Sequence, residues 1–416
     1  MKKNKTIICF DSWTKGYYNF NILSKPLKKF GYKLLLIHTG SWGHDKGRPK
    51  EEYIEKLLVR DISYYNSKSF LDILKLENPK AVLFLSTRAF LHQAFNRYAR
   101  FLSIPTIHRF HGLISVQPIN NKGSTFKFNF LSRLKFAFSV LKKNLKIILP
   151  IYIKSLIITK AELKHWFAFF KEIINKFTYS SSNAPYDSQT DLLFIYTEAD
   201  LKYAIDTYHM NKNNIHIVGN PDYSSFVLKK SDIKSRINQI LNTNKVIYIN
   251  TGTLEEGVVF TSLNDMIKYY KNICNYLKSL NKKLLIKLHP SLEKQSILKK
   301  FKELDIKIIS KKNLINEIKD SEFAIVEPST VSILPAIIGI PVFLTKLGKF
   351  KSQDYGKVLT SYPKSIYLKN LNQLQKGFKT DSFKLDKIDN WLDFNIGPSE
   401  FSKMPERTAK IIDDFL

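Results

Sequence analysis

Cysteine is almost absent from this sequence, whose 416 residues contain only Cys9 and Cys274. Both lie in apolar stretches, so neither a disulfide framework nor a cysteine zinc site is expected. The first residues also lack the apolar core of a signal peptide, because only Thr6–Phe10 lie between the leading lysines and Asp11. These absences predict a protein of the reducing cytoplasm.

Acidic residues are scarce as well: 36 Asp and Glu stand against 66 Lys and Arg, which gives a formal net charge of +30. A surface of that charge favours anionic partners such as phosphorylated donors, lipid headgroups or nucleic acid. No recognisable RNA- or DNA-binding motif accompanies the charge, so we expect no nucleic acid partner. A basic nucleic-acid-binding protein is the alternative outside the enzymes. No Asp-x-Asp pair ends a strand and no His/carboxylate cluster has metal-ligand spacing, so no metal and no cofactor are expected.

Long uncharged apolar runs are also missing, since none reaches the roughly 18 to 20 residues that a membrane-spanning helix needs. The nearest approach lies within 126–177, where apolar runs alternate with lysines, Pro150 interrupts the best run, and Glu162 and Glu172 are the only acids. Basic, aromatic, amphipathic helices lie in the interface of anionic membranes. We therefore expect a helical insertion at about residues 120–180 that contacts an anionic membrane surface. The chain would then be peripheral on the inner face of the cell membrane. An ordinary helical insertion with its lysines in solvent is the alternative.

The residues that are present indicate two α/β domains. The length favours two domains, and 44% apolar and 13% aromatic residues indicate packed cores. Short apolar runs alternate with helical patterns, which is typical of βαβ units on parallel sheets. We predict strands at Thr6–Phe10, Lys33–His38, Ala81–Leu85, Pro105–His108, Leu192–Thr197 and Ile215–Val218, then at Lys245–Asn250, Lys283–Lys287, Lys307–Ile309, Glu322–Val326 and Pro341–Leu344. The expected domains are 1–225 and 226–395, followed by a helical tail at 396–416.

Two polar motifs follow predicted strands in the second half: Lys287-Leu288-His289-Pro290 and Glu327-Pro328-Ser329-Thr330. Ligands of open α/β sheets bind beyond the carboxyl ends of the strands, and we expect these two strands to be neighbours that face one crevice. The first motif supplies charge-assisted donors to a phosphate, and the second supplies hydroxyls and the free N–H groups of a helix start. The alternatives are a histidine that caps a turn and a plain helix N-cap.

The remaining candidate residues complete a group-transfer site. The loop Thr251-Gly252-Thr253 follows a strand and lets backbone approach a phosphate, and Glu327 is expected to bind ribose hydroxyls. The transfer needs a base that deprotonates the acceptor. His111 is the first candidate because imidazole titrates near neutral pH, and Asp11 is the second, provided that burial raises its pKa. His44 and Asp45 are the third candidates for the base. Three cations, Arg88, Arg109 and Lys15, are candidates to hold an acidic acceptor or the carboxylate of the donor.

These motifs occur together in one group of families. Lys287-Leu288-His289-Pro290 resembles the Lys-x-His-Pro motif of bacterial sialyltransferases, polysialyltransferases and CDP-glycerol glycerophosphotransferases, and Ser329-Thr330 resembles the paired hydroxyls that follow it. Gly219-Asn220-Pro221 is similar to a signature before the second domain of the same group. His111-Gly112 resembles a His-Gly of the glycerophosphotransferases, where the histidine is the base. The motifs together span about residues 105–345.

The resemblance implies a GT-B glycosyltransferase, with two Rossmann-like domains facing a central cleft. It implies inverting, metal-independent transfer from a nucleotide-sugar, favoured as a CMP-activated acidic sugar such as sialic acid or Kdo. The acceptor is a glycan or lipid-linked acceptor of a bacterial surface polysaccharide (capsule, lipopolysaccharide). Pro335 stands eight positions after Glu327 where many retaining enzymes have a second glutamate, and Glu327-Pro328 replaces an Asp-Tyr of the glycerophosphotransferases. The acidic pair of the sialyltransferases is matched only by Glu255-Glu256, in the wrong domain. UDP-sugars and CDP-glycerol are the alternative donors.

Overall fold

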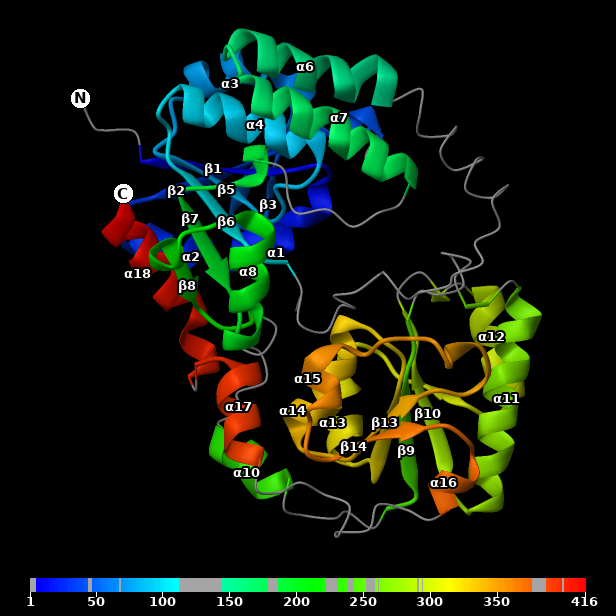
Figure 1. Cartoon of the computed structure of the whole chain (residues 1–416). Helices are drawn as coiled ribbons and strands as arrows, with labels where there is room; N and C mark the ends of the chain where they lie inside the picture. Colours follow the sequence, from blue (N-terminus) through cyan, green and yellow to red (C-terminus); the bar gives the residue numbers. More distant parts are fainter. Residues whose placement is uncertain are drawn as a thin grey trace. The chain divides into compact units, whose positions relative to one another are not determined.

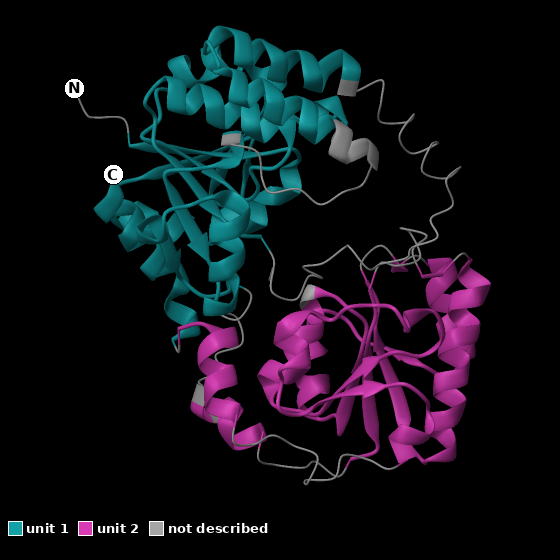
Figure 2. Ribbon diagram, viewed as in Figure 1, with its two compact units in different colours: residues 1–112, 134–225, 400–416 teal, residues 113–133, 226–399 magenta. Residues whose placement is uncertain are grey.

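The structure is a computed structural model that describes residues 5–43, 47–66, 69–111, 144–178, 186–221, 230–237, 243–251, 259–260, 262–289, 292–293, 295–375, 387–398 and 400–416. The chain divides into two compact units (Figure 2). Unit 1 takes Met1–Gly112, Leu134–Ser225 and Glu400–Leu416, whereas unit 2 includes Phe226–Ser399. The C-terminal segment thus belongs to unit 1, although unit 2 precedes it in the chain.

Unit 1 contains an eight-stranded sheet in the order β3-β4-β2-β1-β5-β6-β7-β8 (Figure 1). The strands are β1 (Thr6–Asp11), β2 (Lys33–His38), β3 (Glu51–Ile54), β4 (Leu57–Asp61), β5 (Ala81–Phe84), β6 (Thr106–Arg109), β7 (Leu192–Ile195) and β8 (Ile215–Ile217). All pairings are parallel except that of β3 with β4. The chain adds β2 and β4 on one side of β1 and the later strands on the other. The order therefore reverses between β1 and β5, where doubly wound sheets bind ligands.

The antiparallel pair β3–β4 was not expected from the sequence. Its two strands are joined by a tight turn in which Glu55 takes a left-handed φ of 55°. Every residue of β3 is exposed or half-buried, so this edge strand lacks the apolar run that marks the buried strands. The chain after β1 forms two short helices, Tyr17–Asn21 and Ser24–Lys29. The second begins so that Pro26 lies in its first turn, where the missing N–H of proline is not needed.

Helices cover both faces of this sheet. They are α1 (Tyr17–Asn21), α2 (Ser24–Lys29), α3 (Phe70–Glu77), α4 (Phe90–Phe101), α6 (Leu149–Ile158), α7 (Leu163–Thr178), α8 (Leu201–Tyr208) and α18 (Met404–Phe415). Alternate residues of β1 point to opposite faces. Ile8 and Phe10 pack with α3, α4, α6 and α7, whereas Ile7 and Cys9 pack with α2 and α18.

Unit 2 contains a six-stranded parallel sheet in the order β11-β10-β9-β12-β13-β14 (Figure 1). Its strands are β9 (Lys245–Ile249), β10 (Lys283–Lys287), β11 (Lys307–Ile308), β12 (Phe323–Val326), β13 (Val342–Thr345) and β14 (Ser365–Leu368). The order of strands again reverses, here between β9 and β12. The expectation that β10 and β12 are neighbours is wrong, because β9 lies between them. Strand order is set by long-range pairing that the sequence pattern does not encode.

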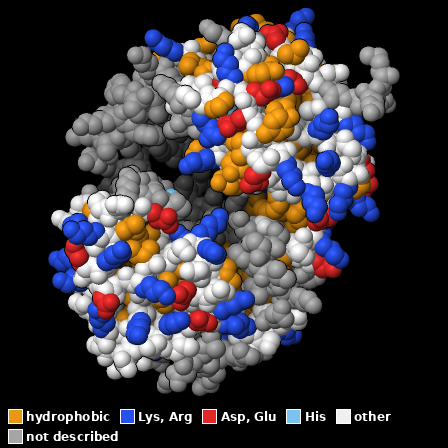
Figure 3. Space-filling view, turned by 180° about the vertical axis from the view of Figure 1, so that it is seen from behind, with side chains coloured by type: hydrophobic (Ala, Val, Ile, Leu, Met, Phe, Trp, Pro, Cys, Tyr) orange, Lys and Arg blue, Asp and Glu red, His pale blue; other side chains and the backbone are white. Residues whose placement is uncertain are grey.

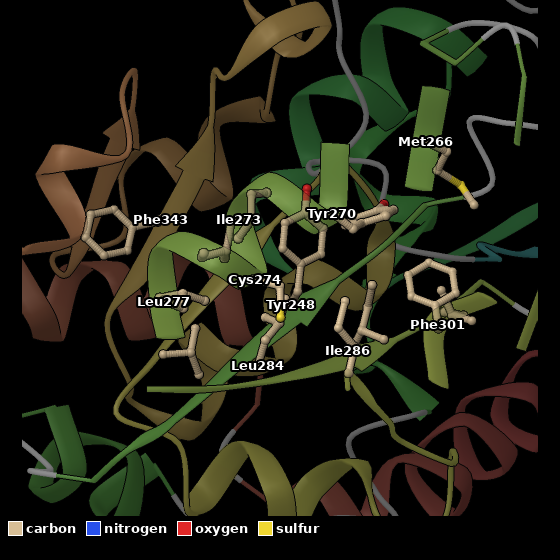
Figure 4. Packing of buried hydrophobic residues seen from close by; sticks show 14 of the residues in the cluster. Tyr248, Met266, Tyr270, Ile273, Cys274, Leu277, Leu284, Ile286, Phe301 and Phe343 are labelled. Carbon is tan, nitrogen blue, oxygen red and sulfur yellow. The ribbon is translucent and has the colours of Figure 1, made fainter. Parts of the chain in front are cut away.

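The helices of unit 2 are α10 (Lys230–Ile237), α11 (Leu263–Ser279), α12 (Gln295–Glu303), α13 (Leu314–Lys319), α14 (Leu334–Ile338), α15 (Gly356–Thr360), α16 (Asn372–Gln375) and α17 (Ile388–Ile396). The buried side of α11 packs on β9, β10 and β12 (Figure 4). Tyr248 of β9 and Tyr270 of α11 lie edge to face in this core, with ring centroids 5.1 Å apart. Two hydroxyl groups are therefore buried beside the carboxyl ends of the strands.

Candidate active site

The carboxyl ends of three strands in unit 2 are level with one another. Lys287 at the end of β10 and Val326 at the end of β12 both pair with Ile249 of β9. The residues that follow these three therefore emerge at one edge of the sheet, on either side of the reversal point. The register therefore brings together the first residues of the two motifs and of the Thr251 loop.

Glu327 is the centre of a buried hydrogen-bond network at this edge. Its exposed fraction is 0%. One carboxylate oxygen accepts from the hydroxyls of Tyr248 (3.0 Å) and Tyr270 (2.6 Å). The other accepts from the backbone N–H (2.8 Å) and hydroxyl (3.0 Å) of Thr251 and from the amide of Asn250 (3.3 Å). Glu327 thus lies beneath the surface and not where a ribose would touch it, and it fixes the backbone at Thr251.

The protonation of this network follows from its burial. Burial raises the pKa of Glu327 above its ordinary value, although the donors Tyr270 and Thr251 act in the opposite direction. Burial also raises the pKa of Tyr248 and Tyr270 well above the usual range, so both hydroxyls stay protonated and donate. Charge-assisted hydrogen bonds of this kind are about twice as strong as neutral ones. The network is therefore a rigid support beneath the carboxyl ends of the strands.

Asn250 joins this network to the Lys287-Leu288-His289 segment. Its side-chain oxygen accepts the backbone N–H of His289 at 3.2 Å, and its amide donates to Tyr270 (2.6 Å) as well as to Glu327. His289 is held through its backbone, and its imidazole is exposed at the strand end. Asn250 was not predicted as a site residue, because an asparagine after a strand also suits an ordinary turn.

Lys287 is buried and already has partners. Its ammonium donates to Glu293 Oε1 at 2.8 Å and to the carbonyl of Leu288. The carboxylate of Glu293 is exposed, so this ion pair is weak and open to exchange. An incoming phosphate would therefore have to compete with Glu293 for the lysine.

Ser329 begins the short helical segment after β12 without a side-chain capping bond. Its hydroxyl lies 2.8 Å from that of Ser332, which itself donates to the carbonyl of Glu327. The Ser329 hydroxyl is therefore the donor of that pair and has two lone pairs left. The side chain of Thr330 and the residues Gly252, Thr253 and Pro290 lie outside what the structure describes.

A further cation at this edge was missed by the sequence analysis. Lys346 directly follows β13, and its ammonium lies 5.7 Å and 5.2 Å from the ring centroids of Tyr355 and Tyr367. The hydroxyl of Tyr355 donates to the carbonyls of Val326 (3.1 Å) and Thr345 (2.6 Å), which ties β12 to β13. Burial lowers the pKa of Lys346. The sequence around Lys346 does not distinguish it from an ordinary surface lysine, because its two aromatic neighbours are brought to it by the fold.

In unit 1 the corresponding position at the reversal point belongs to Asp11, the last residue of β1. Its carboxylate accepts the backbone N–H of Ser12 at 2.6 Å. Burial raises the pKa of Asp11 to about 6, against smaller opposite effects of the N–H groups of Ser12 and Trp13. A Cβ on Gly16 would lie 2.2 Å from the Asp11 carboxylate, so a glycine is required there. The condition set for Asp11 as a base, a raised pKa, is therefore met.

His111 lies at the same edge of the sheet, two residues past the end of β6. Phe10, Phe84 and His108 are level across β1, β5 and β6, so Asp11 and His111 emerge on one side with β5 between their strands. His111 is exposed, in contrast to His108, whose pKa burial lowers to about 3. Of these two histidines, His111 is the one open to solvent.

Of the other candidates of unit 1, Arg109 is the one whose position differs from expectation. Arg109 is completely buried and donates to the carbonyl of Asn19 in α1 at 2.6 Å, so it holds this helix and does not face a substrate carboxylate. Arg88 and Lys15 are exposed. His44 and Asp45 lie outside the described residues. One cavity among the described residues, of about 620 Å³, is lined by Asp191, Leu192 and His216 among others. It lies toward the amino ends of β7 and β8, away from these candidates.

The two doubly wound units, each with polar residues at its reversal point, have the two-domain α/β architecture of the GT-B fold. A variant of the wall teichoic acid polymerase TagF is similar over 99% of this chain and 89% of its own, with 14% sequence identity and a TM-score of 0.52. A putative UDP-N-acetylglucosamine 2-epimerase from Listeria monocytogenes is similar over 99% and 96%, with 10% identity and a TM-score of 0.50. No protein-family model and no curated protein matches the chain. These similarities confirm the predicted two-domain fold with parallel sheets.

Proposed function

We propose that the chain is a group-transfer enzyme that uses a nucleotide-activated donor to build a bacterial surface polymer. The observation that carries the proposal is the level register of β9, β10 and β12, which gathers Thr251, Lys287, His289 and Ser329 at the reversal point of unit 2. A lysine and an exposed imidazole at such a point suit the phosphate of a nucleotide. Both similar structures with this fold bear names of surface-polymer or nucleotide-sugar enzymes.

The favoured donor is a CMP-activated acidic sugar. Support comes from the order of the Lys-x-His-Pro and Ser-Thr motifs and from His289, whose imidazole is exposed while its backbone is fixed by Asn250. CDP-glycerol is the second candidate, because the fold is shared with a wall teichoic acid polymerase and His111-Gly112 resembles the glycerophosphotransferase motif. UDP-sugars are the third. The acceptor is a growing glycan or a lipid-linked acceptor.

The proposed transfer is a direct displacement with inversion. The acceptor hydroxyl loses its proton to a base of unit 1, its oxygen forms a bond to the anomeric carbon, and the bond from that carbon to the phosphate oxygen breaks. The nucleotide leaves with both bonding electrons, and Lys287 and His289 stabilise its added charge. The Ser329 hydroxyl joins them only by giving up its hydrogen bond to Ser332. His111 is the first candidate for the base because its imidazole is exposed at the strand end, and Asp11 is the second because burial raises its pKa to about 6.

Nucleotide binding tests the donor site without knowledge of the acceptor. Calorimetry with cytidine, CMP, CDP and UDP should give a cytosine nucleotide the tightest binding, and the free nucleoside should bind at least about tenfold more weakly than CMP. A nucleoside that binds as well as its phosphates would refute a phosphate site.

Turnover then separates the donors. The purified chain is incubated with CMP-sialic acid, CMP-Kdo, CDP-glycerol and UDP-sugars in the presence of an extract of lipid-linked glycans, and released nucleotide is measured. Release from CMP-sugars supports the favoured donor. Release from CDP-glycerol alone supports the second candidate, and release from UDP-sugars alone contradicts both.

A further inference from the structure

The outer side of helix α7 carries an exposed apolar stripe. Leu163, Phe167 and Phe170 are spaced by four and three residues, so they lie on one side of the helix. Their exposed fractions are 74%, 72% and 56%. Together with Leu145 and Ile157 they make up five of the fifteen exposed large hydrophobic side chains in the described residues, although 144–178 is a small part of the chain. Such a concentration marks an interaction surface, whereas scattered exposed hydrophobics do not.

The inner sides of α6 and α7 are fully engaged, so this stripe cannot turn inward. Tyr152 of α6 and Phe169 of α7 lie 5.3 Å apart, and both pack on Phe90 of α4 at 4.9 Å and 5.7 Å. Figure 1 shows α6 and α7 running beside α4 on one face of the sheet.

A buried acid fixes the same three helices. Asp187 accepts the Tyr152 hydroxyl at 2.5 Å, pairs with Arg97 of α4, and lies 2.9 Å from His165 Nδ1 of α7. These donors hold the pKa of Asp187 below its ordinary value despite burial, which acts in the opposite direction. The outer faces of α6 and α7 are therefore preformed on a rigid support.

Lysines border the stripe. Lys164 and Lys171 each follow a stripe residue by one position, and Lys154 is exposed on α6. Residues 144–178 contain six lysines and only two glutamates. Among the described residues, Lys154 and Lys171 have no ion-pair partner, whereas Lys164 pairs with Glu162 at 2.8 Å. Figure 3 shows the same imbalance on one face of the molecule, where Lys and Arg side chains are spread more widely than Asp and Glu.

We propose that the outer faces of α6 and α7 form a docking surface for an anionic lipid bilayer. Leu163, Phe167 and Phe170 enter the interface between headgroups and acyl chains, and the lysines contact anionic headgroups. A nucleic acid offers no apolar layer to the stripe, and a bilayer offers both components at once. None of the described helices is long and apolar enough to cross a membrane, so the contact is interfacial. The proposal uses no residue of the transfer site.

Vesicle flotation of the full chain tests the surface. Vesicles of equimolar phosphatidylcholine and phosphatidylglycerol should bind the chain, and vesicles of phosphatidylcholine alone should bind it much more weakly. Combined substitution Leu163→Ser, Phe167→Ser and Phe170→Ser should weaken binding at least about tenfold, since each buried side chain contributes to partitioning. The matched control changes Tyr53, Leu76 and Phe101 to serine, which are 74%, 71% and 52% exposed elsewhere in unit 1. Thermal melting and donor-nucleotide affinity should be unchanged in both variants.

The charge component has its own pair of variants. Lys154→Gln, Lys164→Gln and Lys171→Gln together should weaken binding to the anionic vesicles and flatten its dependence on salt. The same exchange at the exposed Lys25, Lys28 and Lys29 of α2 should change little. The proposal is overturned by wild-type binding in the serine variant, by equal binding to both kinds of vesicle, or by a chain that binds duplex DNA and neither vesicle.

Discussion

A carboxylate stands at the reversal point of each sheet, and the two are held in opposite ways. Glu327 in unit 2 is fully buried and accepts five hydrogen bonds from Tyr248, Asn250, Thr251 and Tyr270. Asp11 in unit 1 is half-buried, accepts the backbone N–H of Ser12, and has a pKa raised to about 6. Glu327 is held by a full set of donors, whereas Asp11 is held by few donors and has a raised pKa.

The difference shows that position at a strand end does not decide the role of an acid. Burial raises the pKa of both groups, but only Glu327 has enough donors to make its removal costly. A carboxylate that acts on a substrate must be accessible to it and must have lone pairs without a hydrogen-bond donor. The variants below test this distinction.

The largest expected effect is that of Glu327→Ala. The substitution leaves five donors without an acceptor in a buried place, and we expect a loss of about 3–5 kcal/mol in the free energy of unfolding of unit 2. Thermal or urea unfolding measures it. Tyr270→Phe, which removes one of the five donors and also the acceptor of the Asn250 amide, should cost less, about 1–2 kcal/mol. If Glu327→Ala unfolds like the wild type, the hydrogen-bond network does not support the site.

His289→Ala should have the next largest effect, on rate and not on stability. The contact that holds this residue runs from its backbone N–H to Asn250 and survives the substitution. We expect turnover to fall about 10²–10³-fold, the usual cost of one donor to a developing negative charge. His209→Ala, an exposed histidine at the other end of unit 1's sheet, is the control. Full turnover with unchanged nucleotide affinity in His289→Ala would contradict its assigned role.

Local pattern predicted much of this fold. The buried strands β1, β2, β9, β10 and β12 were found as apolar runs, and Lys287 and His289 were placed at a strand end. The run of Lys283–Lys287 was predicted with its observed bounds, because a strand buried on both faces has no polar interruption.

What the pattern did not contain is long-range pairing. It did not show that β9 separates β10 from β12, that α18 packs in unit 1, or that Tyr270 reaches Glu327. A tyrosine on the buried side of a helix looks like ordinary core, and only the fold shows where its hydroxyl ends. For the same reason Glu327 was expected to touch ribose.

Asp11→Asn should stabilise the protein while it impairs function. Because the pKa of this carboxyl is raised in the folded state, the ionised form opposes folding. The penalty is absent below 3.8, grows as the pH rises toward about 6, and is complete above it. We expect Asp11→Asn to gain about 1–3 kcal/mol at neutral pH and nothing below pH 4, as measured by urea unfolding across pH.

Asp61→Asn, at the end of β4 on the same edge, is the matched opposite. Burial raises the pKa of Asp61, but the donors Ser41 and Ser63 outweigh it and hold the pKa below its ordinary value. Its ionised form therefore favours folding, and its loss should destabilise the protein at neutral pH and progressively less in acid. If both variants changed the free energy of unfolding at neutral pH in the same direction, the distinction between a carboxylate of raised pKa and one held by donors would be wrong.

The smallest expected effect concerns Glu293, the exposed partner of Lys287. Glu293→Gln removes the charge that competes with a phosphate for the lysine at 2.8 Å. Because an exposed ion pair is worth about 0.5–1 kcal/mol, we expect nucleotide phosphates to bind about two- to fivefold more tightly, and the free nucleoside to bind unchanged. Glu322→Gln, which releases Lys282 before the amino end of β10, should change neither. If calorimetry finds the same gain in nucleotide affinity for both variants, the effect is one of net charge. A gain confined to Glu293→Gln would identify Lys287 as the cation that binds the phosphate of the nucleotide donor.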